Sequence, residues 1–437
     1  MNTINSISFG CVADDFTGAS DAASFLAAGG LSTILVNGVP GPAMAPPDDA
    51  DAVVVALKTR TRETAAAVAD TLESLRRLDE MGAGQFYIKY CSTFDSTPKG
   101  NIGPVCDAAM DLWDAPYTLL CPSLPVNGRT VREGRLYVDG VPLERTHMRS
   151  HPLTPMWDSF IPELMRGQSR YPCFLVSAAA MSGEAAAIGR QIEAYRARGK
   201  RFYLIPDYQT DSDAARIVQL FGDLKLLTGG SGLLAALAGR HRRYGDNPVG
   251  GAGKAGQTAG ADRLPPCGSK AVLLAGSCSA ATQAQVGRYL AEGGYGIMLD
   301  PEKLSSGGQD VEAIGEEIRQ SGQEDILIYS PGSAGHLTGG ERESHILEEG
   351  AARLARIALD SGYTRFIVAG GETSGAVVGA LGWSAFQIGA SVAPGVPVMI
   401  PLGVRNARLV LKSGNFGQED FFRRALALTK DGNLMGA

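Results

Sequence analysis

The sequence predicts an α/β protein with two domains, each built on a mostly parallel sheet. Short apolar runs alternate with helical patterns along most of the 437 residues, which is typical of parallel strands covered by helices on both faces. The 56 glycines cluster after the apolar runs, where a strand would turn into a helix. The chain also exceeds the length of one ordinary domain, which is about 150 residues.

The first half begins the alternation at its N-terminus. Strands are expected at 7–13, 32–38, 51–61, 85–93 and 117–125, and helices at 18–30, 63–81 and 104–113. The runs 173–180, 201–207 and 224–239 continue the pattern.

Residues 247–269 contain almost no large apolar side chains and read as a flexible linker. The alternation restarts after this segment, with strand–turn–helix patterns at 270–294, 365–382 and 407–428. We therefore predict an N-terminal domain at 1–246, a linker at 247–269 and a C-terminal domain at 270–437.

Bulk properties exclude several classes of partner. A net charge of −6 gives no reason to expect nucleic acid or an anionic membrane. The N-terminus lacks the pattern of a secretory signal, and no apolar run approaches the ~18 residues of a membrane span. Seven scattered cysteines without a CxxC pair indicate reduced thiols. We expect a cytoplasmic protein with small-molecule ligands; a homodimer is left open.

Three turns in the second half share one form: "GSCS" at 276–279, "GGETS" at 370–374 and "KSGNFG" at 412–417. Each follows an apolar strand, contains small residues and opens a helix. Glycines let backbone amides approach an anion, and a helix N-terminus adds unpaired N–H groups. Each turn alone is weak, but together they could hold the phosphates of a nucleotide.

Standard nucleotide fingerprints are missing. "PVGGAGKAG" resembles a Walker A loop, but Pro248 and Ala255 occupy the positions of its leading glycine and its Ser/Thr. No GxGxxG opens a helix after a strand, so a dinucleotide-dependent dehydrogenase has no direct support.

Two adjacent aspartates, Asp14 and Asp15 in "VADDFTGASD", follow the first strand. Repulsion between neighbouring carboxylates has a cost unless a cation or a proton lies between them. One interpretation is that one carboxylate caps the next helix while the other points to water. The alternative is that the pair handles a substrate hydroxyl or a metal.

Candidates for an anionic substrate lie at two other strand ends. Arg60 lies at the end of the strand at 51–61, and Lys89 begins a polar segment that contains Ser92, Asp95 and Lys99. A segment this rich in hydroxyls and in charges of both signs suits a small polyhydroxy acid, whose carboxylate an arginine can bind with two hydrogen bonds. The alternative is an ordinary polar turn with solvated cations.

Taken together, these motifs resemble the four-carbon acid sugar kinase family. "ADDFTGASD", "KYCSTFDSTPKGNIG", "GSCS", "GGETSG" and "KSGNFG" occur in the family's order over nearly the whole chain. The resemblance implies an N-terminal sugar-acid domain and a C-terminal ATP domain. It places ATP against Ser277, Ser279, Gly371, Glu372, Thr373, Ser374 and Gly414, and the substrate against Asp14, Asp15, Arg60 and Lys89.

Within that family, "CSTFDSTPKGNIGPV", "NGRTV" and "HPLTPM" are similar to the subgroup that acts on 3-oxo-tetronate. Relatives acting on threonate or erythronate usually carry an arginine near the position of Lys99. The implied reaction moves the γ-phosphoryl group of ATP, with Mg²⁺, to the C4 hydroxyl of the acid. Asp15 is favoured as the base because it lies nearer the helix entry, with Asp14 retained; Arg60 and Lys89 would bind the carboxylate.

Other functions stay open at this point. The same chemistry on D-threonate or D-erythronate is the first alternative. A sugar-acid sensor without turnover is the second, although a sensor needs no nucleotide site. An aldolase or dehydrogenase is the third, and ATP consumption separates the second and third alternatives from a kinase.

Overall fold

The computed structural model describes residues 7–150, 154–245, 267–331 and 341–430. The chain divides into two compact units, 1–253 and 254–437, and each is described by itself. Both are α/β units with mostly parallel sheets, which confirms the predicted fold class. The predicted linker at 247–269 lies outside the described residues except for 267–269, and its exact limits stay a prediction.

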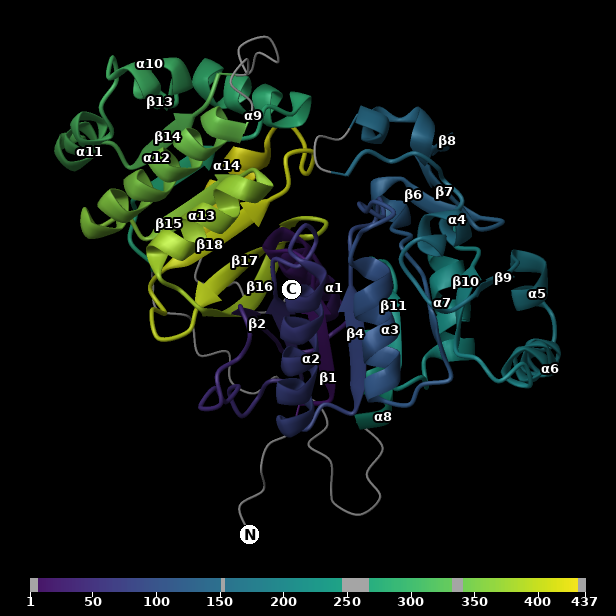
Figure 1. Ribbon diagram of the computed structural model, residues 1–437. Coiled ribbons are helices and arrows are strands. Elements are labelled where there is room, and N and C mark those ends of the chain that lie inside the picture. The colour runs from purple at the N-terminus through teal and green to yellow at the C-terminus, as the bar shows by residue number, and fades with distance from the viewer. Residues whose placement is uncertain (1–6, 151–153, 246–266, 332–340, 431–437) are drawn as a thin grey trace. The chain divides into compact units, whose positions relative to one another are not determined.

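Unit 1 is built on a parallel sheet with the strand order β11-β4-β1-β3-β2 (Figure 1). Its strands are buried, apolar and rich in β-branched residues, as expected for a sheet covered on both faces. The strand bounds are β1 Phe9–Ala13, β2 Thr33–Asn37, β3 Ala52–Ala56, β4 Gln85–Lys89 and β11 Leu226–Gly229.

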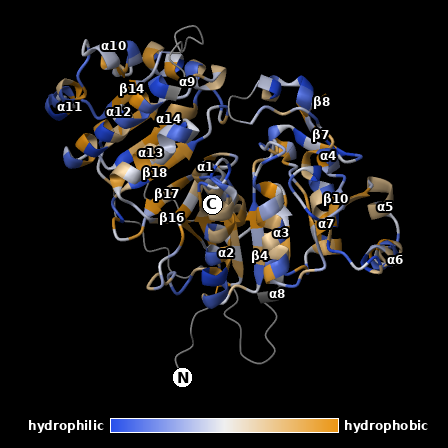
Figure 2. Cartoon of the chain, viewed as in Figure 1, coloured by the Kyte–Doolittle hydropathy of each residue, from blue (hydrophilic) through white to orange (hydrophobic). Residues whose placement is uncertain are grey.

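Helices cover this sheet in pairs. One pair is α1 with α8, and the other is α2 with α3, which lie side by side on one face (Figure 1). The strands are largely hydrophobic, whereas a helix such as α2 combines hydrophobic and hydrophilic residues (Figure 2). The helices are α1 Phe16–Ala28, α2 Thr64–Glu80, α3 Ile102–Leu112 and α8 Leu234–Gly245.

Two small sheets complete unit 1. One is parallel, with the order β5-β10-β9, and the other is antiparallel, with the order β6-β7-β8. Their strands are β5 Tyr117–Leu119, β6 Arg129–Arg132, β7 Arg135–Val138, β8 Val141–Pro142, β9 Cys173–Val176 and β10 Phe202–Pro206. The helices among them are η1 Pro125–Asn127, η2 Leu143–Arg145, η3 His147–Ser150, α4 Ile161–Arg166, α5 Ala178–Ser182, α6 Ala185–Arg196 and α7 Asp211–Phe221.

Several predicted strands end earlier than expected: the strand expected at 51–61 stops at Ala56, the one expected at 85–93 stops at Lys89, and two others stop at recognisable signals. The strand expected at 117–125 stops at Leu119, shortly before Pro122 and Pro125, which cannot donate to a ladder. The strand expected at 173–180 stops at Val176, because Ser177 caps α5 by accepting a hydrogen bond from the Ala180 amide.

Unit 2 carries parallel strands in the order β13-β14-β12-β15-β18, followed by β17 and β16, which pair antiparallel. The strands are β12 Ala271–Ala275, β13 Gly296–Met298, β14 Asp325–Tyr329, β15 Arg365–Ala369, β16 Ala385–Ala393, β17 Val396–Pro401 and β18 Arg408–Lys412. The helices are α9 Ala280–Ala291, α10 Pro301–Ser306, α11 Val311–Gln320, α12 Glu341–Asp360, α13 Gly371–Leu381 and α14 Phe421–Lys430. None of the helices in the described ranges is long and apolar enough to cross a membrane.

In both units the parallel register aligns the strand ends. Ala13 is level with Ala56 and Lys89 in unit 1, and Ala369 is level with Ala275 and Lys412 in unit 2. The polar segments after these residues therefore leave the same edge of their sheet, which is the edge where open α/β sheets bind ligands.

Candidate functional site

The two adjacent aspartates have different environments. Asp15 has an extended backbone and caps α1, since its carboxylate accepts hydrogen bonds from the Gly18 amide and from the Thr17 hydroxyl (2.9 Å). The interpretation of one aspartate as a helix cap is therefore confirmed for Asp15. Asp14 does not point to water, because it binds an arginine.

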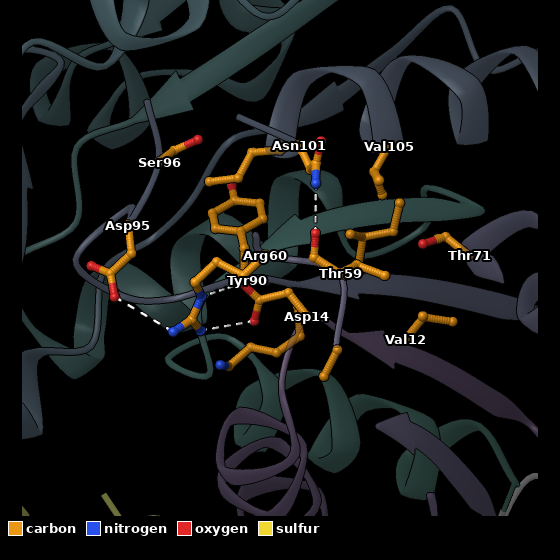
Figure 3. Close-up of a pocket in the computed structure, with 14 residues that line it drawn as sticks. Val12, Asp14, Thr59, Arg60, Thr71, Tyr90, Asp95, Ser96, Asn101 and Val105 are labelled. Atoms are coloured by element: carbon orange, nitrogen blue, oxygen red, sulfur yellow. Dashed lines mark hydrogen bonds and ion pairs between the residues drawn. The ribbon is translucent and has the colours of Figure 1, made fainter. Parts of the chain in front are cut away.

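Arg60 joins three carboxylates. Its Nε donates to Asp14 Oδ2 at 2.9 Å and its Nη2 to Asp14 Oδ1 at 3.1 Å, which makes a bidentate pair. Nη2 also contacts Asp15. Nη1 lies 3.6 Å from Asp95, and the contacts of Arg60 with Asp14 and Asp95 are drawn in Figure 3. All three nitrogens of the guanidinium thus face carboxylates of the protein.

Asn101, at the start of α3, holds the segment that carries Arg60. Its side-chain amide donates to the carbonyls of Thr59 (2.7 Å) and Arg62 (2.8 Å). A pocket lined by Asp14, Arg60, Lys89, Asp95 and other residues lies at this strand edge (Figure 3).

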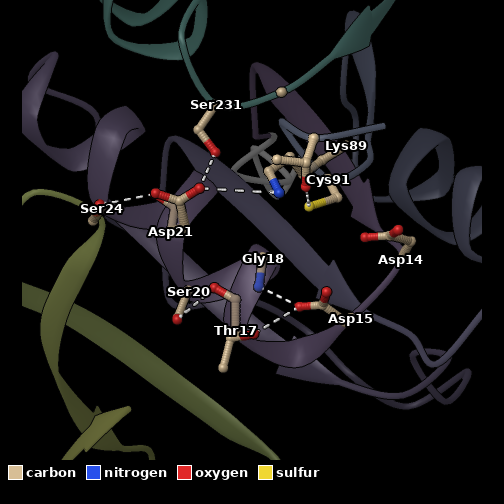
Figure 4. A network of polar contacts seen from close by, with 12 residues as sticks. Asp14, Asp15, Thr17, Gly18, Ser20, Asp21, Ser24, Lys89, Cys91 and Ser231 are labelled. Carbon is tan, nitrogen blue, oxygen red and sulfur yellow. Dashed lines mark hydrogen bonds and ion pairs between the residues drawn. The ribbon is translucent and has the colours of Figure 1, made fainter. Parts of the chain in front are cut away.

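Lys89 occupies the centre of a second group of polar residues. Its side chain is 4% exposed, and its Nζ lies 4.0 Å from Asp21 Oδ2 in α1. The Ser231 hydroxyl, which follows β11, donates to the same carboxylate (Figure 4). Gly18 makes room for the ammonium, because a Cβ there would lie 2.8 Å from Lys89 Nζ.

These contacts separate the pKa values of the three aspartates. Burial, together with the charge of Asp15, raises the pKa of Asp14 although Arg60 opposes it. Burial also acts to raise the pKa of Asp15, but Arg60 and Lys89 outweigh it and lower that pKa to about 2. Burial raises the pKa of Asp21 to about 6 against the opposing charge of Lys89. Asp15 is therefore a weak base, whereas Asp14 and Asp21 are better proton acceptors near neutral pH.

The predicted residues of this half are only partly brought together. Asp14, Asp15, Arg60, Lys89 and Asp95 share one network through their charges. By contrast, Lys99 is exposed and Ser92 is half-buried, and neither of them lines the pocket described above.

Asp21 and Ser231 were missed by the sequence reasoning. Asp21 lies three residues after Gly18. Because residues i and i+3 lie on the same face of a helix, a helix predicted to begin after Asp15 could have placed Asp21 on the same face as Gly18. Ser231 had no comparable signal, since 210 residues separate it from Asp21.

The three glycine turns of unit 2 meet. The Ser279 hydroxyl accepts from the Thr282 amide, which caps α9, and donates to the Gly414 carbonyl at 2.6 Å. The Gly370 amide donates to the Lys412 carbonyl at 3.0 Å, and the Ser277 amide to the Ala369 carbonyl at 3.2 Å. The ends of β12, β15 and β18 therefore form one continuous surface of turns.

Glycine is required in this surface. A Cβ on Gly276 would collide with the Thr373 hydroxyl, and one on Gly414 with the Ser277 hydroxyl. Gly370 has a φ of +133° and precedes α13, whose N-terminus has no side-chain cap. A pocket is lined by Gly276–Cys278, Gly370–Thr373, Ser344, Leu347 and Glu348. Uncapped amides beside such a pocket fit an anion like a phosphate.

The predicted nucleotide residues do not all lie in that pocket. Ser277, Gly371, Glu372 and Thr373 line it. The fully buried Ser374 instead donates to the Gly370 carbonyl at 2.6 Å, which makes it a support for the turn.

Lys412 supports the same surface and was not singled out from the sequence. Its buried ammonium donates to the Gly414 carbonyl (2.9 Å), the Ser413 carbonyl (3.3 Å) and the Thr282 hydroxyl (2.8 Å). The Gly414 carbonyl also accepts from the Thr282 hydroxyl at 2.8 Å. Burial lowers the pKa of Lys412 to about 7.

Comparisons with known proteins match each unit to a family model. A model described as a sugar-binding N-terminal domain matches residues 9–237, and one described as a nucleotide-binding C-terminal domain matches residues 272–422.

Curated relatives cover nearly the whole chain. A protein from Pseudomonas savastanoi pv. phaseolicola named 3-oxo-tetronate kinase is 41% identical over 95% of this chain and 96% of its own length. One of the same name from Brucella melitensis is 41% identical over 97% of this chain and 96% of its own length.

Solved structures agree with this match. A crystal structure from Salmonella typhimurium LT2, described as a candidate tRNA synthase, is 37% identical with a TM-score of 0.82 over 96% of this chain and 98% of that one. A Haemophilus influenzae protein is 38% identical with a TM-score of 0.75 over 96% of this chain and 100% of that one.

Proposed function

Because the chain belongs to the four-carbon acid sugar kinase family, we propose that it transfers the γ-phosphoryl group of ATP to the C4 hydroxyl of 3-oxo-tetronate. The observation that carries the proposal is the 41% sequence identity, over nearly the full length of the chain, with relatives named for this activity. The half-buried carboxylates of unit 1 and the glycine turns of unit 2 supply the chemistry that such a kinase needs.

The turns of unit 2 would hold the nucleotide. The uncapped amides at the start of α13 and the hydroxyl of Ser277 face the pocket, where they can donate to phosphate oxygens. Ser279, Thr282 and Lys412 fix the Gly414 carbonyl and so keep the third turn in place.

Mg²⁺ neutralises charge on the transferred phosphates in this type of reaction. Glu348 and Glu372 line the pocket of unit 2, and these two carboxylates would hold the ion beside the phosphates. Within the described ranges no three Asp, Glu, His or Cys side chains cluster as a metal site. Two carboxylates fit Mg²⁺, which usually binds through one or two carboxylates, water and phosphate oxygens.

Asp14 is our candidate for the group that accepts the proton of the C4 hydroxyl. Asp15 was the first choice from the sequence, but its carboxylate is occupied by the first turn of α1 and has a low pKa. Asp14 has a raised pKa, and Arg60 fixes its orientation. Arg60 would accordingly position the base rather than bind the carboxylate of the substrate.

ADP release with Mg²⁺–ATP tests the function. The panel would contain 3-oxo-tetronate, both enantiomers of threonate and both enantiomers of erythronate. We expect turnover with 3-oxo-tetronate to exceed that with the other acids. Turnover with only threonate or erythronate would keep the kinase and change its substrate. Acid binding without ADP release would favour the sensor, and cleavage or oxidation of an acid without ATP would favour an aldolase or dehydrogenase.

The remaining expectations concern the setting of the reaction. We place it in the cytoplasm, where ATP is available, with a small acid and ATP as the ligands. A homodimer stays a prediction, which sedimentation of the full chain would test.

A further inference from the structure

Among the buried polar atoms of unit 1 that have no hydrogen-bond partner within the described residues, four come close together in the fold. They are Asp21 Oδ1, Ser123 Oγ, Asn127 Nδ2 and Arg129 Nε. Asp21 is 6% exposed and Ser123 is fully buried. Buried polar atoms are rarely left unpaired, because each has lost its hydrogen bonds to water without gaining others. A group of them is therefore a candidate for a ligand site.

The four atoms belong to one region of the unit. The hydroxyl of Ser231 binds Asp21, and a Cβ on the next residue, Gly232, would collide with the Ser123 carbonyl. Two backbone hydrogen bonds of 2.8 and 3.1 Å between Leu124 and Arg129 then bring the chain back beside Ser123.

The loop closed by these bonds also orients Arg129. Its guanidinium donates to the Asn127 carbonyl, and its charge is among those that lower the pKa of Asp21. Asp21, Ser123 and Arg129 thus lie around the end of β11. The "NGRTV" motif at 127–131 is part of this loop, and the proposed function has so far given it no role.

The net charge of this region differs from that of the region around Asp14. Around Asp21, Lys89 and Arg129 carry two positive charges against one negative charge, which leaves +1; Lys89 also acts on Asp14 and Asp15. Arg60 carries one positive charge against three carboxylates, Asp14, Asp15 and Asp95, which leaves −2. A monoanionic acid is attracted to the first group and repelled by the second.

We propose, resting on the proposed function, that Lys89 and Arg129 bind the carboxylate of the sugar acid and that Asp21 accepts a hydrogen bond from its C2 hydroxyl. Ser123 and Asn127 complete this subsite. The acid then lies along the first turns of α1, with its C4 hydroxyl toward Asp14. Six residues separate Asp15 from Asp21, or about 9 Å of helix rise, which a four-carbon acid with one hydrogen bond at each end can span.

The test compares 3-oxo-tetronate with erythrulose, in which a CH₂OH group replaces the carboxylate. In R129M, we expect kcat/KM for the acid to fall about 10- to 100-fold, the loss expected for a charged hydrogen bond. The kcat/KM of R129M for erythrulose should change less than about threefold. R129K should lie between wild type and R129M for the acid, because it keeps the charge but loses the fork of donors.

R132M is the matched control. Arg132 is an exposed arginine on the same strand, at the other end of β6, and its loss should alter neither substrate. Thermal unfolding of each variant without ligand shows whether the hairpin is intact. An equal fall in kcat/KM for the acid and for erythrulose in R129M, or no fall for either, would overturn the proposed subsite and leave the proposed kinase activity unaffected.

Calorimetry of 3-oxo-tetronate binding to the full chain without ATP separates the two proposals. If no acid is turned over but R129M loses binding that R132M keeps, the subsite stands and the proposed function fails. Equal binding to both variants overturns the subsite. No acid binding to the wild type overturns both.

Discussion

At the scale of single residues, two adjacent side chains of the same type differ in role because they have different hydrogen-bond partners. Asp14 and Asp15 are adjacent and Arg60 contacts both, yet Asp14 forms a bidentate pair with the guanidinium whereas Asp15 accepts from the Gly18 amide and the Thr17 hydroxyl at the start of α1. The sequence could predict that such a pair has a purpose. It could not predict the division of roles, because that depends on Arg60, which lies 45 residues from Asp15 in the chain.

Asp14→Asn and Asp15→Asn test this division. Asn caps a helix about as well as Asp, so D15N should keep the stability of α1 and lose little activity. D14N should lower kcat by about 10²-fold or more, because it removes the proposed proton acceptor. Thermal unfolding of both variants serves as the control for folding. A similar kcat for D14N and D15N would contradict the assignment.

Lys412 predicts a pH dependence of nucleotide binding. Burial lowers its pKa to about 7 in the free protein, and a bound phosphate nearby would raise that pKa. A pKa that rises on binding means that affinity is complete below about pH 7 and is lost as the pH rises above it.

Calorimetry of ATP binding between about pH 7.5 and 9.5 measures this effect, because the phosphates themselves stay ionised in that range. We expect the affinity of the wild type to fall across the range and that of K412M to stay level. K412M keeps the hydroxyl donors of Ser279 and Thr282 on the Gly414 carbonyl, so the turn should persist. The same slope in both proteins would exclude Lys412 as the titrating group.

At the scale of elements, the first turn of α1 combines a cap with an opening for a cation. Gly18 donates its amide to Asp15, and its missing side chain leaves room for the Lys89 ammonium. Elsewhere in a helix, glycine is less favourable than alanine by about 1 kcal/mol. This glycine therefore serves the site at the expense of the helix.

Gly18→Ala tests whether this glycine is needed to make room for Lys89. The added methyl group would displace the flexible end of Lys89, so KM for the acid should rise about tenfold while kcat changes less. Stability should stay within about 1 kcal/mol of the wild type, because helix propensity offsets the contact. Gly189→Ala in α6, where a Cβ would meet open space, is the control. An unchanged KM in G18A would mean that Lys89 does not bind the acid.

The strands and their order along the chain were predictable, but which strands pair with each other in the sheet was not. Apolar runs such as "AVVVA" in β3 predict buried strands, and glycine after a strand predicts the turns of unit 2. Ser231 reaches Asp21 only because β11 pairs with β4 at the edge of the sheet. A pairing between such distant segments leaves no periodic signal in one sequence.

At the scale of the whole molecule, each unit supplies a different chemistry. The site residues of unit 1 are ionised side chains, whereas those of unit 2 are mostly backbone amides and hydroxyls. The order of the motifs along the chain was enough to predict this division. Arg129, the arginine that we propose for the acid, was not predictable, since the sequence reasoning singled out Arg60 and only the partners of each arginine distinguish the two.

Gly414→Ala tests whether the two sites can be impaired separately. Its Cβ would collide with the Ser277 hydroxyl and would lie 3.0 Å from the Ser279 hydroxyl, so the turns must move apart. We expect ATP affinity to fall about tenfold or more, the effect of a local cost of 1–3 kcal/mol. Binding of the acid to the full chain, measured by calorimetry without nucleotide, should stay within about twofold of the wild type.

The control for this variant is Gly379→Ala, an exposed glycine of α13 whose Cβ would meet open space. It should leave both affinities unchanged, because it adds a methyl group to unit 2 without touching the turns. If G414A weakened the acid as strongly as it weakened ATP, the acid would depend on the turns of unit 2. The subsite of Lys89 and Arg129 could then not be the whole of its binding site.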